Sequence, residues 1–163
     1  PTGAYGMTEE VADRIKSIVK REYIDTVGIG GTLAGNALSL AAMRVTLTQV
    51  MTKENFANMI ELADAWSDGV DAAIAKYNLP WHCNRLGARG EYLFQPHAPK
   101  TGKEAADAGD FELEQYIHLR MLNDGILITP FHNMALVSPD TSKSDIEKHT
   151  KAFRAMCADL VKV

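Results

Sequence analysis

The sequence predicts an α+β fold with a small, mainly antiparallel sheet covered by helices. The first part of the chain contains long stretches with apolar residues at helical spacing, which predict helices. In the second part, short apolar stretches bounded by turn residues predict strands, and these alternate with two further helices. At 163 residues the chain has the size of one ordinary domain. Apolar residues make up 46% and charged residues 23%, which is typical of a globular protein and excludes a disordered chain or a disulfide-rich miniprotein.

Charge and composition also exclude several partners. The formal net charge of -4 argues against a nucleic-acid-binding surface. No apolar run approaches the ~20 residues that span a bilayer, and no signal peptide is evident, so no membrane partner is expected. The two cysteines, Cys83 and Cys157, indicate no disulfide framework and favour the cytoplasm. Because the chain begins at Pro1 without an initiator Met, we interpret it as part of a longer protein.

Two helices are expected early in the chain, on either side of a glycine-rich segment. Thr8 can cap the first, over 9–21, and its apolar residues keep helical spacing. Residues 27–36 are too rich in glycine for regular structure. The second helix, over 37–51, is apolar on nearly every side, and such a helix is normally buried all round. We therefore expect it to pack against another subunit or a missing domain.

The rest of the chain alternates helices with short strands. A long helix is expected over 53–77 and another over 110–123, while Ser142 and Asp145 begin the last helix as a capping box. Proline and glycine make 95–109 a surface loop. Strands are expected over the short apolar stretches between these elements: 81–84, 90–94, 126–129 and 134–138.

The glycine-rich segment is the strongest local signal for chemistry. Gly30, Gly31 and Thr32 precede the N-terminus of the second helix. Glycines let backbone N–H groups approach an anion closely, and the Thr hydroxyl adds a donor, so phosphate binding is one interpretation. The other is that the glycines serve only a tight turn. The segment has neither the Lys of a P-loop nor the spacing of a dinucleotide fingerprint.

A second set of candidates lies around the expected strands. Arg85 and Arg89 flank a turn, and the planar guanidinium suits a substrate carboxylate. Glu91 offers the alternative of a plain ion pair with Arg89. His132 and Asn133 follow a proline between two strands and could line a pocket mouth, although loop residues usually face solvent. The histidines and cysteines show no metal-binding spacing, so no metal is expected.

A resemblance to a known family covers almost the whole chain. Residues 30–36 resemble the G-G-T-x-x-G-N signature of class III aminotransferases, the pyridoxal 5'-phosphate (PLP) enzymes of fold type I. Residues 1–6 resemble the P-x-G-A-x-G segment that these enzymes carry shortly after their Schiff-base lysine, and 84–88 resemble a strand turn of their small domain. The tract 125–134 is similar to the glutamate-semialdehyde aminomutase and β-amino-acid (β-phenylalanine type) aminotransferase branch.

This resemblance implies the domain organisation and the cofactor contacts. Residues 1–51 would form the end of the large PLP-binding domain with an interface helix, and 52–163 the small C-terminal domain. The Thr of the signature contacts the PLP phosphate of the neighbouring subunit in the family, which implies that role for Thr32, with the backbone of Gly31 beside it, in a homodimer. The Schiff-base lysine would lie before residue 1, in the N-terminal part of the same enzyme, so no catalytic residue is expected in this chain.

The implied function is transfer of an amino group between an amino acid, for which a β-amino acid is a candidate, and a keto acid. Many relatives carry a carboxylate-binding Arg on the late strands, but 126–138 contains none, so Arg89 is the substitute candidate, with His132 and Asn133 as further substrate contacts. Two alternatives stay open. One is a non-catalytic dimerisation or binding module of the same fold, and the other is an aminomutase or racemase of the same family.

Overall fold

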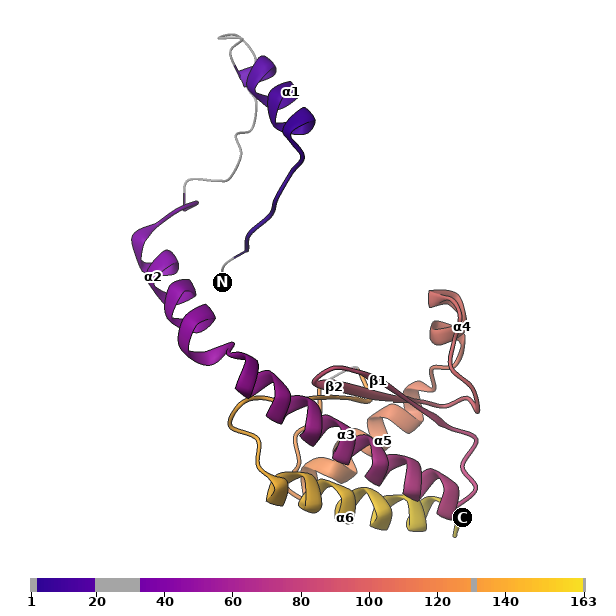
Figure 1. The fold of residues 1–163 in the computed structure, drawn as a ribbon. Helices are drawn as coiled ribbons and strands as arrows, with labels where there is room; N and C mark the ends of the chain where they lie inside the picture. The colour runs from indigo at the N-terminus through magenta and orange to yellow at the C-terminus, as the bar shows by residue number, and fades with distance from the viewer. Residues whose placement is uncertain (1–2, 20–32, 130–131, 163) are drawn as a thin grey trace. The chain divides into compact units, whose positions relative to one another are not determined.

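The computed structural model describes residues 3–19, 33–129 and 132–162 (Figure 1). The chain divides into two compact units, Pro1–Thr52 and Lys53–Val163, called here the N-terminal unit and the C-terminal unit. Gly31 and Thr32, the two residues expected at the phosphate, lie outside the described residues. Among the described residues, no helix has the length and hydropathy needed to cross a bilayer.

The described part of the N-terminal unit contains three helical elements. Helix α1 (Glu9–Val19) begins where the Thr8 hydroxyl accepts a hydrogen bond from the Val11 N–H at 3.4 Å, as the capping argument predicts. Helix α2 (Ala37–Val45) runs directly into a π-helical turn, η1 (Thr46–Val50). The helix expected over 37–51 is therefore present, but with a wider last turn.

Two threonines mark this change of helix type. The hydroxyls of Thr46 and Thr48 donate to the carbonyls of Ala42 and Arg44, four residues earlier, at 2.9 and 2.7 Å. Such back-bonding competes with the backbone ladder and bends helices. No residue of α2 or η1, all of which are described, is buried.

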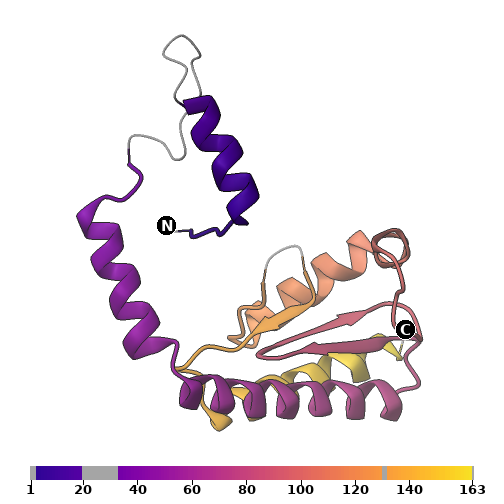
Figure 2. The same cartoon turned by 45° about the horizontal axis from the view of Figure 1, so that its top comes forward.

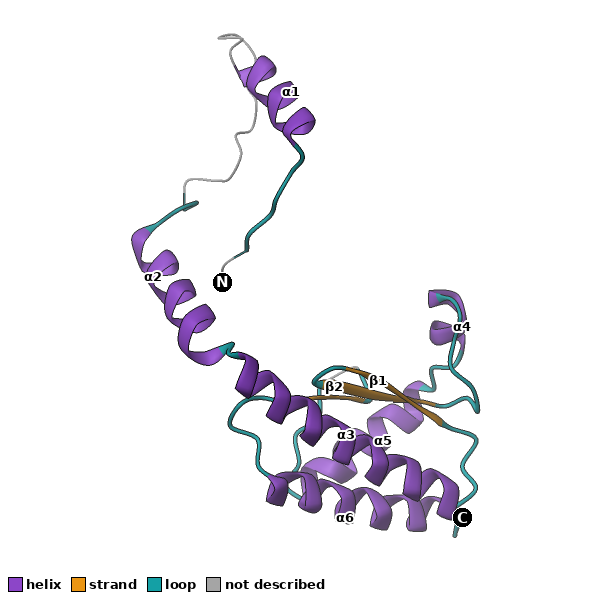
Figure 3. Cartoon of the chain, in the orientation of Figure 1, coloured by secondary structure: helices purple, strands orange, loops and turns teal. Residues whose placement is uncertain are grey.

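The C-terminal unit combines helices with a three-stranded antiparallel sheet in the order β1-β2-β3 (Figure 3). Its elements, in chain order, are α3 (Lys53–Lys76), β1 (His82–Leu86), β2 (Arg89–Leu93), α4 (Gly102–Asp107), α5 (Phe111–Asn123), β3 (Met134–Leu136) and α6 (Lys143–Leu160). Gly87, in the two-residue turn from β1 to β2, adopts a φ of +56°, which costs glycine little. This architecture confirms the predicted α+β fold with a mainly antiparallel sheet.

The core lies between the sheet and its helices. Figures 1 and 2 show α3 and α6 side by side along one face of the β1–β2 hairpin. Cys83 of β1 and Tyr92 of β2 are directly opposite in the register and both face these helices. Fully or nearly fully buried side chains come from several elements: Trp66 and Val70 of α3, Tyr92 of β2, Ile117 and Met121 of α5, and Phe153 and Met156 of α6.

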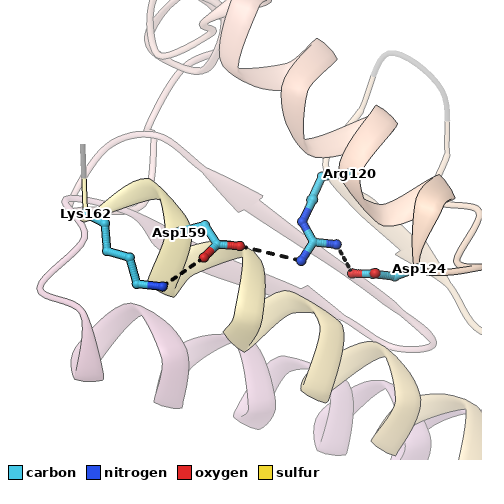
Figure 4. A network of polar contacts seen from close by, with 4 residues as sticks. All are labelled: Arg120, Asp124, Asp159 and Lys162. Carbon is cyan, nitrogen blue, oxygen red and sulfur yellow. Dashed lines mark hydrogen bonds and ion pairs between the residues drawn. The ribbon is translucent and has the colours of Figure 1, made fainter.

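A polar contact ties α5 to α6 at the surface. Arg120 of α5 pairs with Asp124 in the turn after that helix and reaches Asp159 of α6 at 3.6 Å (Figure 4). Asp159 also accepts a hydrogen bond from Lys162 at 3.1 Å. Because exposed ion pairs contribute little free energy, the buried contacts beneath them hold the two helices together.

Two of the expected elements were wrong. Residues 126–129 do not join the sheet, because the Ile126 N–H donates to the Met121 carbonyl at 2.9 Å and ties the backbone to the end of α5. Ile128 is nevertheless buried. The apolar residue type at this position therefore reflects burial in the core, not pairing of a strand. The expected loop 95–109 contains the short helix α4, which Thr101 caps by accepting a hydrogen bond from the Glu104 N–H.

Candidate functional site

The β1–β2 hairpin separates its two arginines onto opposite faces. Successive strand residues point to alternate faces, and Arg85 pairs in register with Gly90, one residue after Arg89. Arg85 lies on the α3 side, where Asp68 and Asp71 contact its guanidinium at 2.8 and 2.7 Å. These two carboxylates raise the pKa of Arg85, and the guanidinium forms structural ion pairs with α3. Of the two arginines, only Arg89 lies on the opposite face of the hairpin.

That other face carries a hollow of about 430 Å³, called here the hairpin hollow. Strand residues Asn84, Arg89 and Glu91 line it, together with residues of α4 and the beginning of α5. His132 and Asn133 complete its wall. The structure thus brings together Arg89, His132 and Asn133, the three residues that the sequence singled out for substrate contact.

Glu91 lies between the two basic groups of the hairpin hollow. One of its carboxylate oxygens pairs with Nη2 of Arg89 at 2.9 Å, and the other lies 3.7 Å from Nδ1 of His132. The ion pair considered from the sequence is therefore present. The Arg89 side chain remains 48% exposed, and a guanidinium has five N–H donors, so this pair leaves donors for a ligand.

Asn133 is held in place by the sheet. Its backbone carbonyl accepts a hydrogen bond from the Tyr92 N–H at 3.1 Å, and the residue is only 6% exposed. His132 is the more accessible of the two, with a side chain 59% exposed. The expectation that loop residues face solvent therefore fits His132 but not Asn133.

Glu114 also lines this candidate site, although the sequence did not indicate it. It lies in the first turn of α5, behind the N-cap Asp110, and lines the hairpin hollow. Partial burial raises the pKa of Glu114, with the nearby His132 acting in the opposite direction. An acidic residue in the first turn of a helix is common because it suits the helix dipole, so the sequence offered no reason to single it out.

The residues after the expected phosphate loop have a defined geometry. Gly35 adopts a φ of +70°, and Asn36 caps α2 by accepting a hydrogen bond from the Ser39 N–H at 2.9 Å. The Asn36 side chain also donates to the Leu33 carbonyl at 2.8 Å. The turn is thus fastened to the N-terminus of a helix, where free N–H groups and the dipole suit an anion.

Comparison with known proteins gives the chain its relatives. No family model matches it. A glutamate-1-semialdehyde 2,1-aminomutase 2 from Geobacillus kaustophilus is 32% identical over 161 residues, covering 98% of this chain and 36% of the relative. The glutamate-1-semialdehyde 2,1-aminomutase from Bacillus subtilis is 28% identical over 162 residues, which cover 98% of this chain and 36% of the relative. The chain spans about a third of the length of these curated relatives.

A solved structure agrees with both the sequence and the fold. The glutamate-1-semialdehyde aminomutase from Pseudomonas aeruginosa PAO1 is 45% identical, with a TM-score of 0.89 over 95% of this chain and 35% of the other. The chain is thus a relative of glutamate-1-semialdehyde aminomutases and class III PLP transaminases. It matches the C-terminal portion of these enzymes, as its motifs predicted.

A more distant member of this fold supports the same architecture. The β-phenylalanine aminotransferase from Variovorax paradoxus has a TM-score of 0.73 over 83% of the chain. At 21% identity, this likeness bears on the fold alone. The arrangement of α3, α6 and the sheet is therefore a fold that these proteins share, while substrate and reaction need separate evidence.

Proposed function

We propose that this chain is the C-terminal portion of a PLP-dependent aminotransferase that acts on an amino acid. The observation that carries the PLP-dependent chemistry, which aminotransferases and aminomutases share, is the 45% identity with the P. aeruginosa aminomutase, one structure of which is in complex with PMP. The hairpin hollow adds a geometric reason, because it gathers a cation, an imidazole and a buried amide on one face of the sheet. The general base and the lysine that binds the cofactor would come from the N-terminal part of the enzyme.

The cofactor phosphate would be held by the Thr32 hydroxyl and the Gly31 N–H. Support comes from the fastened turn and the capped N-terminus of α2 that follow these residues. PLP, when bound, supplies an electron sink for the carbanion formed by proton removal. The phosphate would belong to the neighbouring subunit of a homodimer, and the exposed apolar surface of α2 and η1 supports such an assembly. We also propose a cytoplasmic location, since both cysteines are free.

Arg89 would bind the substrate carboxylate through the donors that Glu91 leaves unused. An unpaired carboxylate is costly in a closed site, so a fixed cation is needed. His132 and Asn133 would orient the substrate from the neighbouring wall. The hydrogen bond that its backbone carbonyl accepts from Tyr92 of β2 fixes the backbone from which the Asn133 side chain extends.

An aminomutase is the second candidate, and the names of the curated relatives favour it. The two reactions differ in whether a second substrate accepts the amino group. The complete PLP-loaded enzyme is incubated with amino-acid donors, with and without a keto acid, and separately with glutamate 1-semialdehyde alone. Transfer that requires the keto acid supports the aminotransferase, and conversion of the semialdehyde without an acceptor supports the aminomutase. Binding of PLP without either reaction would support the third alternative, a non-catalytic module of the same fold.

A further inference from the structure

A second hollow lies beside the first, between α5 and the described residues Ile128, Thr129, His132 and Asn133. Its volume is about 210 Å³, and we call it the α5 hollow. Phe111 and His118 of α5 line it, with Ile128 opposite. Three residues, Glu114, His132 and Asn133, line both hollows. The two hollows therefore share a wall, with Arg89 on one side and the apolar residues on the other.

The apolar lining belongs to a face of α5 that the core does not use. Ile117 and Met121 are fully buried in the core, whereas Phe111 remains 68% exposed. A large aromatic side chain in that position contributes little to the folding of this unit. Ile128 adds an apolar surface that is fixed by its burial. The α5 hollow thus offers Phe111 and Ile128 as contacts for an apolar group, beside polar lining residues that include Gln115 and Thr129.

The size of the α5 hollow fits a ring. An apolar cavity of about 150 Å³ is known to bind benzene, so about 210 Å³ accommodates a phenyl group or a branched aliphatic chain.

The charges around the shared wall oppose a second carboxylate. Glu114 lines both hollows, and burial already raises its pKa because its surroundings disfavour negative charge. Glu91 adds another carboxylate on the side of the hairpin hollow. An anionic side chain placed in the α5 hollow would meet Glu114, and among the described lining residues only His118 and His132 can carry a positive charge. An uncharged side chain meets no such penalty.

We propose that the α5 hollow binds an uncharged, apolar side chain of the substrate, of about the size of a phenyl ring, while the substrate carboxylate binds Arg89 across the shared wall. The proposal rests on the proposed function for the role of Arg89. It assigns Phe111 as a specificity-determining residue and Glu114 as the group that rejects anionic side chains.

The test measures equilibrium binding, which does not depend on turnover. Isothermal titration of the complete enzyme compares 3-phenylpropanoate, propanoate and glutarate, which share one carboxylate and differ in the group beyond it. We expect 3-phenylpropanoate to bind most tightly. Phe111→Ala should weaken its binding about tenfold and leave propanoate unchanged, because only the ring contact is lost. Glu114→Gln should improve the binding of glutarate relative to propanoate.

Leu119→Ala is the matched control, since Leu119 is an exposed apolar residue of the same helix that does not line the α5 hollow. It should leave all three affinities unchanged. Equal affinities for 3-phenylpropanoate and propanoate, or equal effects of Phe111→Ala and Leu119→Ala, would overturn the proposal. Phe111-dependent binding of 3-phenylpropanoate, in an enzyme that transfers no amino group from any donor, would support the α5 hollow and overturn only the proposed function.

Discussion

Trp66 donates its indole N–H to Nε2 of His149 at 3.0 Å, and this bond joins α3 to α6 inside the core. His149 is only 6% exposed, and its ring stacks on Phe153 with the centroids 5.7 Å apart. As an acceptor, Nε2 must be free of a proton, so the bond requires the neutral imidazole. Burial acts in the same direction and lowers the pKa of His149 to about 4.

This buried histidine predicts a loss of stability in mild acid. Between about pH 6.5 and pH 4 the unfolded chain binds a proton that folded His149 does not, so the free energy of unfolding falls as the pH falls. The full difference amounts to up to about 3 kcal/mol. Hydrogen exchange at the core amides of α3 and α6 in the complete enzyme, followed over this pH range, measures the fall in the free energy of unfolding. In His149→Gln this part of the pH dependence should disappear; an unchanged profile would contradict the assignment.

Gly90 predicts a steric effect in the same core. A Cβ at this position would lie 2.6 and 2.7 Å from two ring atoms of Trp66 and 2.8 Å from Oγ of Ser67. The indole is rigid and only 2% exposed, so it cannot move aside cheaply. We expect Gly90→Ala to destabilise the enzyme by about 1–3 kcal/mol, seen as a lower melting temperature. Gly102→Ala is the control, because nothing lies within 4 Å of the added atom, and it should melt like the parent.

The apolar surface of α2 and η1 predicts the behaviour of the isolated chain. Leu38 of α2 is 81% exposed and Leu47 of η1 is 56% exposed. Exposed apolar patches of this kind promote association, so the chain alone should aggregate. Light scattering should show less aggregation for Leu38→Lys with Leu47→Lys, but not for Leu86→Lys, which changes a leucine of the C-terminal unit that is 76% exposed. A monodisperse 17.9 kDa monomer of the unchanged chain would contradict this expectation.

Local signals made most of the fold predictable. The capping box of α6 is confirmed, with the Ser142 hydroxyl accepting from the Asp145 N–H and the Asp145 carboxylate accepting from the Ser142 N–H. Such a motif involves neighbours three residues apart, so the sequence contains all of it. Residues 126–129 show the opposite case. Whether an apolar stretch pairs as a strand or fills the core beside a helix end depends on distant partners that periodicity does not report.

The candidate site was predictable in part for the same reason. Alternation along the strands separates Arg85 from Arg89, but only the tertiary structure shows that Asp68 and Asp71 occupy the former. Glu114 came from a different helix, with no local pattern to connect it with Arg89. Its place at the shared wall follows from how α5 packs beside the hairpin, which the sequence of α5 alone does not determine.

The phosphate contact proposed for Thr32 predicts weaker cofactor retention in Thr32→Ala. A hydrogen bond to a charged group contributes about 1.5–3 kcal/mol, so the dissociation constant of PLP should rise by roughly one to two orders of magnitude. Thr32→Ser keeps the hydroxyl and should show a smaller rise. Equilibrium dialysis of the complete enzyme measures both. An unchanged dissociation constant in the alanine variant would return the glycine-rich segment to the role of a tight turn.

The last prediction concerns Arg89 and the substrate carboxylate. In the complete enzyme, Arg89→Ala should reduce kcat/KM for a carboxylate-bearing amine donor by about tenfold or more, because the fixed cation is lost, while an uncharged amine of similar shape is little affected. Arg89→Lys keeps the charge but loses the planar fork, so an intermediate loss is expected. Glu91→Gln should act in the opposite direction: without its ion pair at 2.9 Å, Arg89 has no competing carboxylate from β2.

These variants separate substrate binding from a merely structural role of the hairpin. Arg85→Ala is the control, since Arg85 contacts two carboxylates on α3 and faces away from the hairpin hollow. It should affect stability and leave the preference between the two donors unchanged. If Arg89→Ala reduced kcat/KM equally for both donors, its contact with Glu91 would serve only to hold β2 in shape. The carboxylate would then have to bind a cation supplied by the N-terminal part of the enzyme.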